Sequence, residues 1–122
     1  MITFEYLDSE TREQLMDLMD GEHDEIIDLI DTLIETNPMY IEELEASLAT
    51  QDSNGVRNAA HALKSAFAQI GALAMASILK EIEHAGRVGD ISGVPALWES
   101  AKKEGEKVAQ AFESWKTELA SL

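Results

Sequence analysis

Apolar residues recur every three or four positions along most of this chain, and no useful length of it alternates as a strand would. The pattern predicts helices over about 24–51, 54–69 and 72–88, a last helix from a Ser92 cap to about 120, and a short one over about 9–19. Short connections between amphipathic helices favour antiparallel neighbours. We therefore expect an all-α fold, an antiparallel four-helix bundle with a short additional N-terminal helix, as one domain over residues 1–122.

A proline interrupts the pattern of the first long helix. Asn37-Pro38 should break it, because a proline inside a helix removes a hydrogen bond and crowds the preceding turn. The apolar positions nevertheless keep one phase through the proline: Ile30, Ile34, Ile41, Leu44 and Leu48. This favours one long kinked helix, with two separate helices as the alternative.

The last helix has an apolar stripe with nearly ideal helical spacing. It comprises Val94, Leu97, Trp98, Ala101, Gly105, Val108, Phe112, Trp115 and Leu119. A glycine within such a stripe predicts that another helix approaches closely at Gly105. We assign the aromatic and methionine positions of these stripes to the core rather than to a cofactor site.

Composition excludes several kinds of chemistry. The chain has no cysteine, which excludes disulfides, thiol catalysis and cysteine-ligated metals. No His-x-x-x-His pair places two metal ligands on one helix face, so we expect no metal site. The first residues have no basic segment followed by an apolar run, so we expect no secretory signal, and no apolar run approaches the roughly 18 residues of a membrane span. We expect a cytoplasmic protein without membrane contact, and a monomer.

The charge is large and uneven. The net charge of −15 argues against a nucleic-acid partner. Residues 1–53 carry 16 acidic residues and one basic residue, whereas residues 54–122 carry eight of each. Residues 54–88 are locally basic, with four basic and two acidic residues, and this would attract an anionic partner.

One histidine of the three, His61, lies in this basic stretch. If Leu63 marks the centre of the apolar face of its helix, His61 lies about 160° away and points out of the core. Its exposed side is shared by Arg57, Lys64, Ser65 and Ala68. His23 and His84 are most simply surface residues.

The neighbours of His61 favour a reactive group. Ser65 and Ala68 are small and leave the imidazole accessible, and the Lys64 ammonium could reach an anion on the ring. An exposed imidazole titrates near neutral pH, so its nucleophilic form is available. From these residues alone, a phosphoacceptor histidine and an ordinary surface histidine both remain open, and no second catalytic group pairs with His61.

The stretch from His61 to Ala72, HALKSAFAQIGA, resembles the signature of histidine-containing phosphotransfer (HPt) domains. That signature is His-x-Leu-Lys-(Gly/Ser)-x-x-x-x-φ-Gly-Ala, where φ is apolar. Two alanines precede the histidine, as is common in the family, and a second apolar helix with an acidic residue near its end follows, here LKEIEHAG. The resemblance extends over nearly the whole chain and implies a single HPt domain.

The resemblance implies a role for each matching residue. His61 corresponds to the phosphorylated histidine and Lys64 to the lysine that helps hold the phosphoryl group. Ser65 stands where glycine is frequent, which puts a hydroxymethyl group into the interface, and Gln69 stands at a polar rim position. With Arg57 and Ala68, these two residues form the predicted docking face.

The resemblance also implies the reaction. His61 would accept a phosphoryl group from a receiver-domain aspartyl phosphate and pass it to another receiver. Partners would be response-regulator receiver domains, a hybrid sensor kinase, or both, with Mg²⁺ held by the receiver. The chain has no ATP-binding or kinase motif, so we expect a carrier without a cofactor of its own rather than an enzyme.

Two other functions stay open. A non-phosphorylated bundle could use the same fold to sequester or inhibit a signalling partner. A kinase-docked substrate domain would be phosphorylated directly by an ATP-binding domain.

Overall fold

The computed structural model describes residue 13 and residues 23–69 and 71–121. Four helices follow one another in it: α2 (His23–Ala49), α3 (Ser53–Gln69), α4 (Leu73–Val88) and α5 (Val94–Ser121). The ends of these helices differ from the predicted ends by no more than two residues, and the described residues form no strand. The predicted helix over about 9–19 lies outside the described residues, apart from Glu13.

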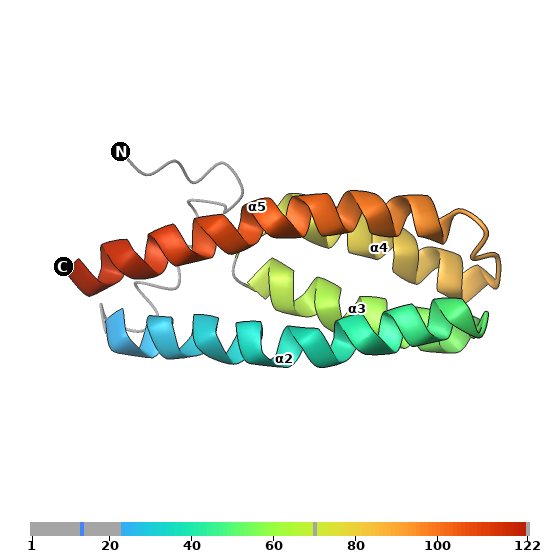
Figure 1. Cartoon of the computed structure of the whole chain (residues 1–122), viewed down its shortest axis with the longest axis horizontal. Helices are drawn as coiled ribbons and strands as arrows, with labels where there is room; N and C mark the ends of the chain where they lie inside the picture. Colours follow the sequence, from blue (N-terminus) through green and yellow to red (C-terminus); the bar gives the residue numbers. More distant parts are fainter. Residues whose placement is uncertain (1–12, 14–22, 70, 122) are drawn as a thin grey trace.

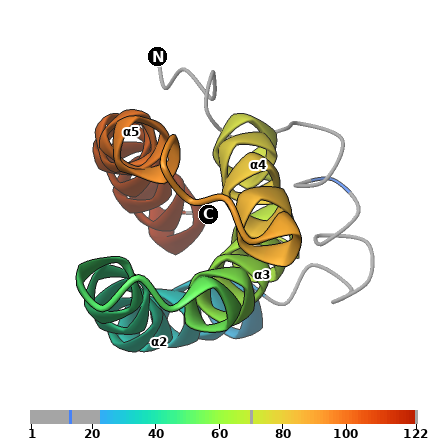
Figure 2. The same cartoon turned by 90° about the vertical axis from the view of Figure 1, so that its right-hand side faces the viewer.

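The helices form the expected antiparallel bundle. Consecutive helices run in opposite directions (Figure 1). The end view shows them at the corners of a square, where α2 and α4 each pack against α3 and α5 (Figure 2). With 27 and 28 residues, α2 and α5 extend well beyond the shorter hairpin of α3 and α4 (Figure 1). No helix within the described ranges has both the length and the apolar character that a membrane span requires.

Each helix contributes one apolar face to a single core. The core comprises Leu44, Val56, Ala59, Ala60, Leu63, Phe67, Ala72, Met75, Leu79, Ile82, Val94, Trp98, Ala101, Val108, Ala111, Phe112 and Trp115. Burial of each large side chain in it contributes about 1.5–3 kcal/mol to folding. Six positions of the predicted α5 stripe belong to this core, so the 3.6-residue spacing placed that helix correctly.

Pro38 lies inside α2 and does not divide it, because one helix continues from His23 to Ala49. The proline is exposed, so its ring faces solvent rather than the core. Of the two alternatives, the continuous helix is confirmed, while the kink stays a prediction.

The turns use local caps. Asp52 caps α3, because its Oδ1 accepts a hydrogen bond from the Gly55 amide at 3.1 Å. Gly71 and Gly89 follow α3 and α4 with φ angles of 87° and 83°, which glycine adopts without strain. The predicted cap at Ser92 is wrong: α5 begins at Val94, and the Ser92 hydroxyl donates to Asp90 instead.

A close backbone approach between helices occurs at Gly86 and not at Gly105. A Cβ atom at Gly86 would lie 2.7 Å from the amide nitrogen of Arg57 and 2.8 Å from the carbonyl oxygen of Ser53. At Gly105 the nearest atom would be the flexible end of Met75 at 3.6 Å, an ordinary contact. The expectation of a close helix approach at Gly105 was therefore wrong. The fold instead requires a glycine at Gly86, where α4 packs against the backbone of α3.

Candidate functional site

His61 lies on the solvent face of α3, and 63% of its side chain is exposed. Leu63, two positions later, is buried in the core. The helical wheel thus predicted the direction of the imidazole correctly. Arg57, one turn before His61, is the residue whose backbone packs against Gly86, so α4 runs very close to α3 beside the histidine.

This close approach brings a carboxylate under the imidazole ring. Glu83 lies one turn before Gly86 on α4, and its side chain is only 6% exposed. It is flanked along α4 by the buried residues Leu79, Ile82 and Gly86. An ionised carboxylate in such a place requires partners, because burial without them costs several kcal/mol.

Three nitrogen-bearing side chains supply these partners. His61 Nδ1 lies 3.2 and 3.3 Å from the two carboxylate oxygens of Glu83. Lys64 Nζ lies 2.8 Å from Oε2 and 3.3 Å from Oε1, and Arg87 Nη2 donates to Oε1 at 3.1 Å. We call these four residues the Glu83 cluster; it joins α3 and α4 through one buried acid.

The cluster keeps Glu83 ionised. Burial raises the pKa of its carboxyl group, but the hydrogen bonds from Lys64 and His61, together with their charges, outweigh burial. The pKa therefore lies below its ordinary value. An ionised carboxylate only accepts hydrogen bonds, so the Nδ1 atom of His61 carries a hydrogen and donates it.

This hydrogen bond selects one tautomer of the neutral imidazole. With the hydrogen on Nδ1, the lone pair is on Nε2, the nitrogen not bonded to Glu83. Glu83 also orients the ring and stabilises positive charge that develops on it, as a carboxylate does for a histidine in other sites. The geometry therefore equips Nε2 of His61 as a nucleophile.

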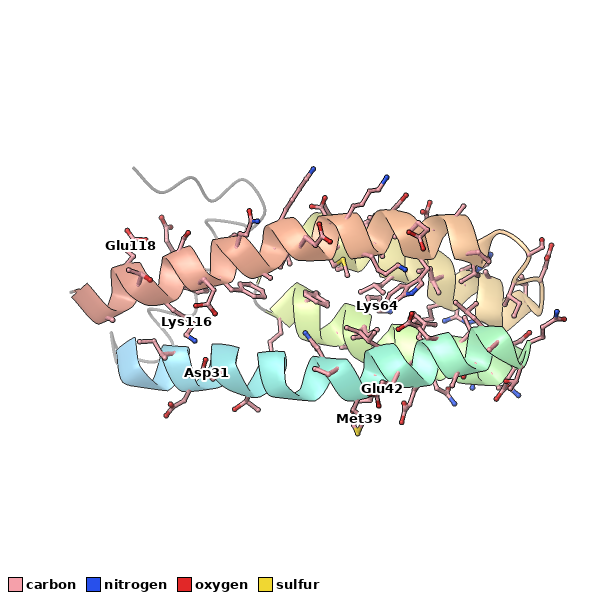
Figure 3. All side chains as sticks on the ribbon, viewed as in Figure 1. Asp31, Met39, Glu42, Lys64, Lys116 and Glu118 are labelled. Carbon is pink, nitrogen blue, oxygen red and sulfur yellow. The ribbon has the colours of Figure 1, made fainter. Side chains whose placement is uncertain are left out.

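Lys64 pairs with Glu83, and its predicted role toward a phosphoryl group stays a prediction. The Lys64 side chain is 26% exposed. Its ammonium contacts the Glu83 carboxylate and does not lie free above the imidazole ring. Figure 3 shows Lys64 among the side chains where α3 and α4 meet. An anion on His61 would have to share this ammonium with Glu83.

The predicted docking residues lie along the same side of α3. Arg57 is half-buried one turn before His61, while Ser65, Ala68 and Gln69 are exposed. Gln69 is about 12 Å farther along the helix axis than His61, from the rise of about 1.5 Å per residue. The structure thus brings His61 and Lys64 together at Glu83 and places Arg57 in the pocket beside His61. Ser65, Ala68 and Gln69 lie farther along α3.

Two pockets flank the cluster. One, of about 330 Å³, is lined by Arg57, Asn58, His61, Glu83 and Arg87. The other, of about 530 Å³, is lined by Lys64, Lys80, Glu81, Glu83, His84, Arg87 and Leu97. Glu83 and Arg87 line both, so the histidine lies beside basic residues on either side.

Sequence reasoning missed Glu83 and Arg87, and with them the group that pairs with His61. A signal was present, since Glu83 falls on the same helix face as Leu79, where a charged residue is unusual.

No group of residues suited to a metal is found in the described ranges. His84 is exposed, as expected, and the side chain of His23 lies outside the description.

Comparison with known proteins indicates the family of this chain. The model of the Hpt domain family matches residues 28–122. The crystal structure of histidine-containing phosphotransfer protein B (HptB) from Pseudomonas aeruginosa PAO1 is similar, with a TM-score of 0.86 and 28% sequence identity. The similarity covers 95% of this chain and 98% of that one. No curated protein is similar enough in sequence to count as a relative.

Proposed function

Because this chain belongs to the Hpt domain family, and is thus a histidine phosphotransfer protein of a phosphorelay, we propose that His61 is its phosphoacceptor. One observation carries the proposal. His61 combines an exposed side chain with a buried carboxylate on Nδ1, which leaves Nε2 as the nucleophile. His84 is also exposed on the bundle, but none of the hydrogen bonds found among the described residues pairs it with a carboxylate.

The proposed reaction exchanges one phosphorus bond for another. Nε2 of His61 attacks the phosphorus of an aspartyl phosphate on a receiver domain, the N–P bond forms, and the acyl P–O bond breaks. The aspartate leaves as a carboxylate, and the Nδ1 hydrogen stays between the ring and Glu83. Glu83 thereby balances the positive charge of the phosphorylated imidazole. The reverse reaction delivers the group to another receiver.

Lys64 and Arg87 stabilise the transferred group. Phosphoryl transfer depends mainly on positioning and on neutralising charge at the phosphoryl oxygens. Lys64 and Arg87 contact Glu83 beside the ring, and Arg57 lines the same pocket as His61. The Mg²⁺ that the reaction requires is supplied by the receiver, so the chain acts as a carrier without a cofactor of its own.

The docking face consists of Arg57, Ser65, Ala68 and Gln69 around His61. A receiver active site is acidic, and a protein with a net charge of −15 would repel it. The basic residues of α3 and α4 reduce this repulsion where the two proteins meet. A receiver of a response regulator or of a hybrid kinase is the proposed partner, and a monomer suffices for the reaction.

Intact-mass spectrometry tests the phosphoacceptor. The wild type, His61→Gln and His84→Gln would each be mixed with a receiver domain charged by acetyl phosphate and Mg²⁺, and separately with phosphoramidate. We expect one acid-labile, base-stable phosphoryl group on the wild type and on His84→Gln, and none on His61→Gln. Uptake by His61→Gln would reject the assignment.

Two further assays separate the alternatives. Phosphorylation by a kinase and ATP without any receiver would identify a kinase-docked substrate domain. Partner binding that survives His61→Ala, without phosphoryl uptake from any donor, would identify a sequestering protein.

A further inference from the structure

A third pocket, of about 460 Å³, is mostly apolar and lies chiefly between α2 and α5. Its lining comprises Asn37, Pro38, Ile41, Phe67, Met75, Trp98, Ala101, Lys102, Gly105, Glu106, Ala109 and Phe112. The sequence explains the space. Ala101, Gly105 and Ala109 follow one another at four-residue intervals along α5, so a row of small residues faces the pocket where larger ones would fill it.

Two residues of the lining each carry a buried polar atom without a partner. Among the described residues, Asn37 Oδ1 and Trp98 Nε1 are the buried side-chain nitrogen and oxygen atoms without a hydrogen bond. Asn37 is 9% exposed and Trp98 is 5% exposed. A buried polar group without a partner is unfavourable, and native proteins satisfy nearly all of them. That both atoms occur at one pocket points to a missing group at this place.

The chemistry of the two atoms defines that group. Trp98 Nε1–H is a donor, whereas Asn37 Oδ1 is an acceptor. A hydroxyl group has the chemistry that serves both, because its oxygen accepts from an indole while its hydrogen is donated to an amide oxygen. A carboxylate would leave the asparagine without a donor, and an ammonium would leave the indole without an acceptor.

We propose that this pocket binds a small neutral molecule with an aromatic or otherwise flat apolar body and one hydroxyl group. The body would lie against the aromatic side chains of Phe67, Trp98 and Phe112. The two charged residues of the lining, Lys102 and Glu106, are exposed, so the interior suits an uncharged ligand. The site shares no lining residue with either pocket beside His61 and does not depend on the proposed phosphoacceptor.

The test compares p-cresol with toluene, which differ only in the hydroxyl. The indole N–H signals are followed by NMR in the ¹⁵N-labelled protein, where the chain offers only two tryptophans and Trp98→Phe assigns them. We expect p-cresol to shift the Trp98 signal saturably and to bind about tenfold or more tightly than toluene. 4-Methylanisole, which retains an acceptor but has no donor, should bind with intermediate affinity.

Two variants examine the site itself. Asn37→Leu removes the acceptor at nearly constant size and should weaken p-cresol binding severalfold without changing toluene binding. Ala109→Leu should block both ligands by filling the pocket while leaving both polar atoms in place. Equal affinity of p-cresol and toluene, or no saturable shift of the Trp98 signal, would overturn the proposal. If the Trp98 signal showed no saturable shift, water alone would satisfy the two polar atoms.

Discussion

Glu83 accepts a hydrogen bond from Nδ1 of His61 at 3.2 Å, although the two residues lie 22 positions apart on different helices. The contact exists because α3 and α4 pack backbone against glycine at Gly86, one turn beyond Glu83. His61 and the carboxylate that orients it are therefore coupled to the packing of the hairpin.

Replacing Glu83 by glutamine should slow phosphorylation of His61. Glutamine keeps the size but loses the charge, so the Nδ1 hydrogen is held less firmly and charge on the ring is no longer balanced. We expect a decrease of about 10- to 100-fold in the rate with phosphoramidate, the range for loss of a carboxylate that orients a histidine. Glu81→Gln, an exposed acid on the same helix, is the matched control. If the two variants reacted equally fast, Glu83 would be only structural.

The lowered pKa of Glu83 predicts how stability depends on pH. Between the folded pKa and the ordinary value of 4.5, the unfolded chain binds more protons than the folded one. The contribution of Glu83 is thus complete above about pH 4.5 and disappears as the pH falls through the folded pKa. Within that window the wild type should lose up to about 1.4 kcal/mol more per pH unit than Glu83→Gln.

Urea unfolding at a series of pH values between neutral and acid would measure this difference. Glu81→Gln should follow the wild type. Parallel curves for the wild type and Glu83→Gln would show that the cluster does not favour the ionised carboxylate.

Gly86 and Gly105 offer a matched pair for stability. Alanine favours helix over glycine by about 1 kcal/mol. The new methyl group of Gly105→Ala would lie 3.6 Å from Met75, an ordinary contact, so this variant should be neutral or more stable. Gly86→Ala places a methyl group 2.7 Å from the Arg57 backbone nitrogen and should cost about 1–3 kcal/mol. Urea denaturation would measure both. The Gly86 variant should also react more slowly with phosphoramidate, because α4 moves away from His61. Equal stability of the two variants would contradict the assigned approach.

The same two glycines show what the sequence could predict. Periodicity predicted the helices, and the wheel predicted the exposure of His61, because both depend on residues near in sequence. Both glycines lie among buried positions, but only the packing decides which one faces a backbone. Glu83 was missed for the same reason: its partners lie on another helix, and its own neighbours suggested only an apolar face. Glu83 and Arg87 enter the site through tertiary contact.

Charge reversal on the docking face should slow transfer between proteins more than it slows the intrinsic reactivity of His61. Lys116 is unsuitable as a control, because it pairs with Asp31 and links α5 to α2, as Figure 3 shows. Lys103 on α5 is exposed and forms none of the ion pairs found in the described ranges. Arg57→Glu should reduce the rate of transfer from a charged receiver about tenfold or more at low salt, and Lys103→Glu much less, since charges near the contact steer association.

Rapid-quench measurement of the two variants at low and high ionic strength would check this. The difference between them should shrink as salt rises, because the Debye length falls to about 3 Å at 1 M. Phosphoramidate, which is too small to depend on docking, should phosphorylate both variants at more similar rates. An Arg57→Glu defect of the same size with phosphoramidate as with the receiver would move Arg57 from the docking face to the phosphoryl group itself. Equal transfer rates for the two variants would instead show that the partner docks away from α3.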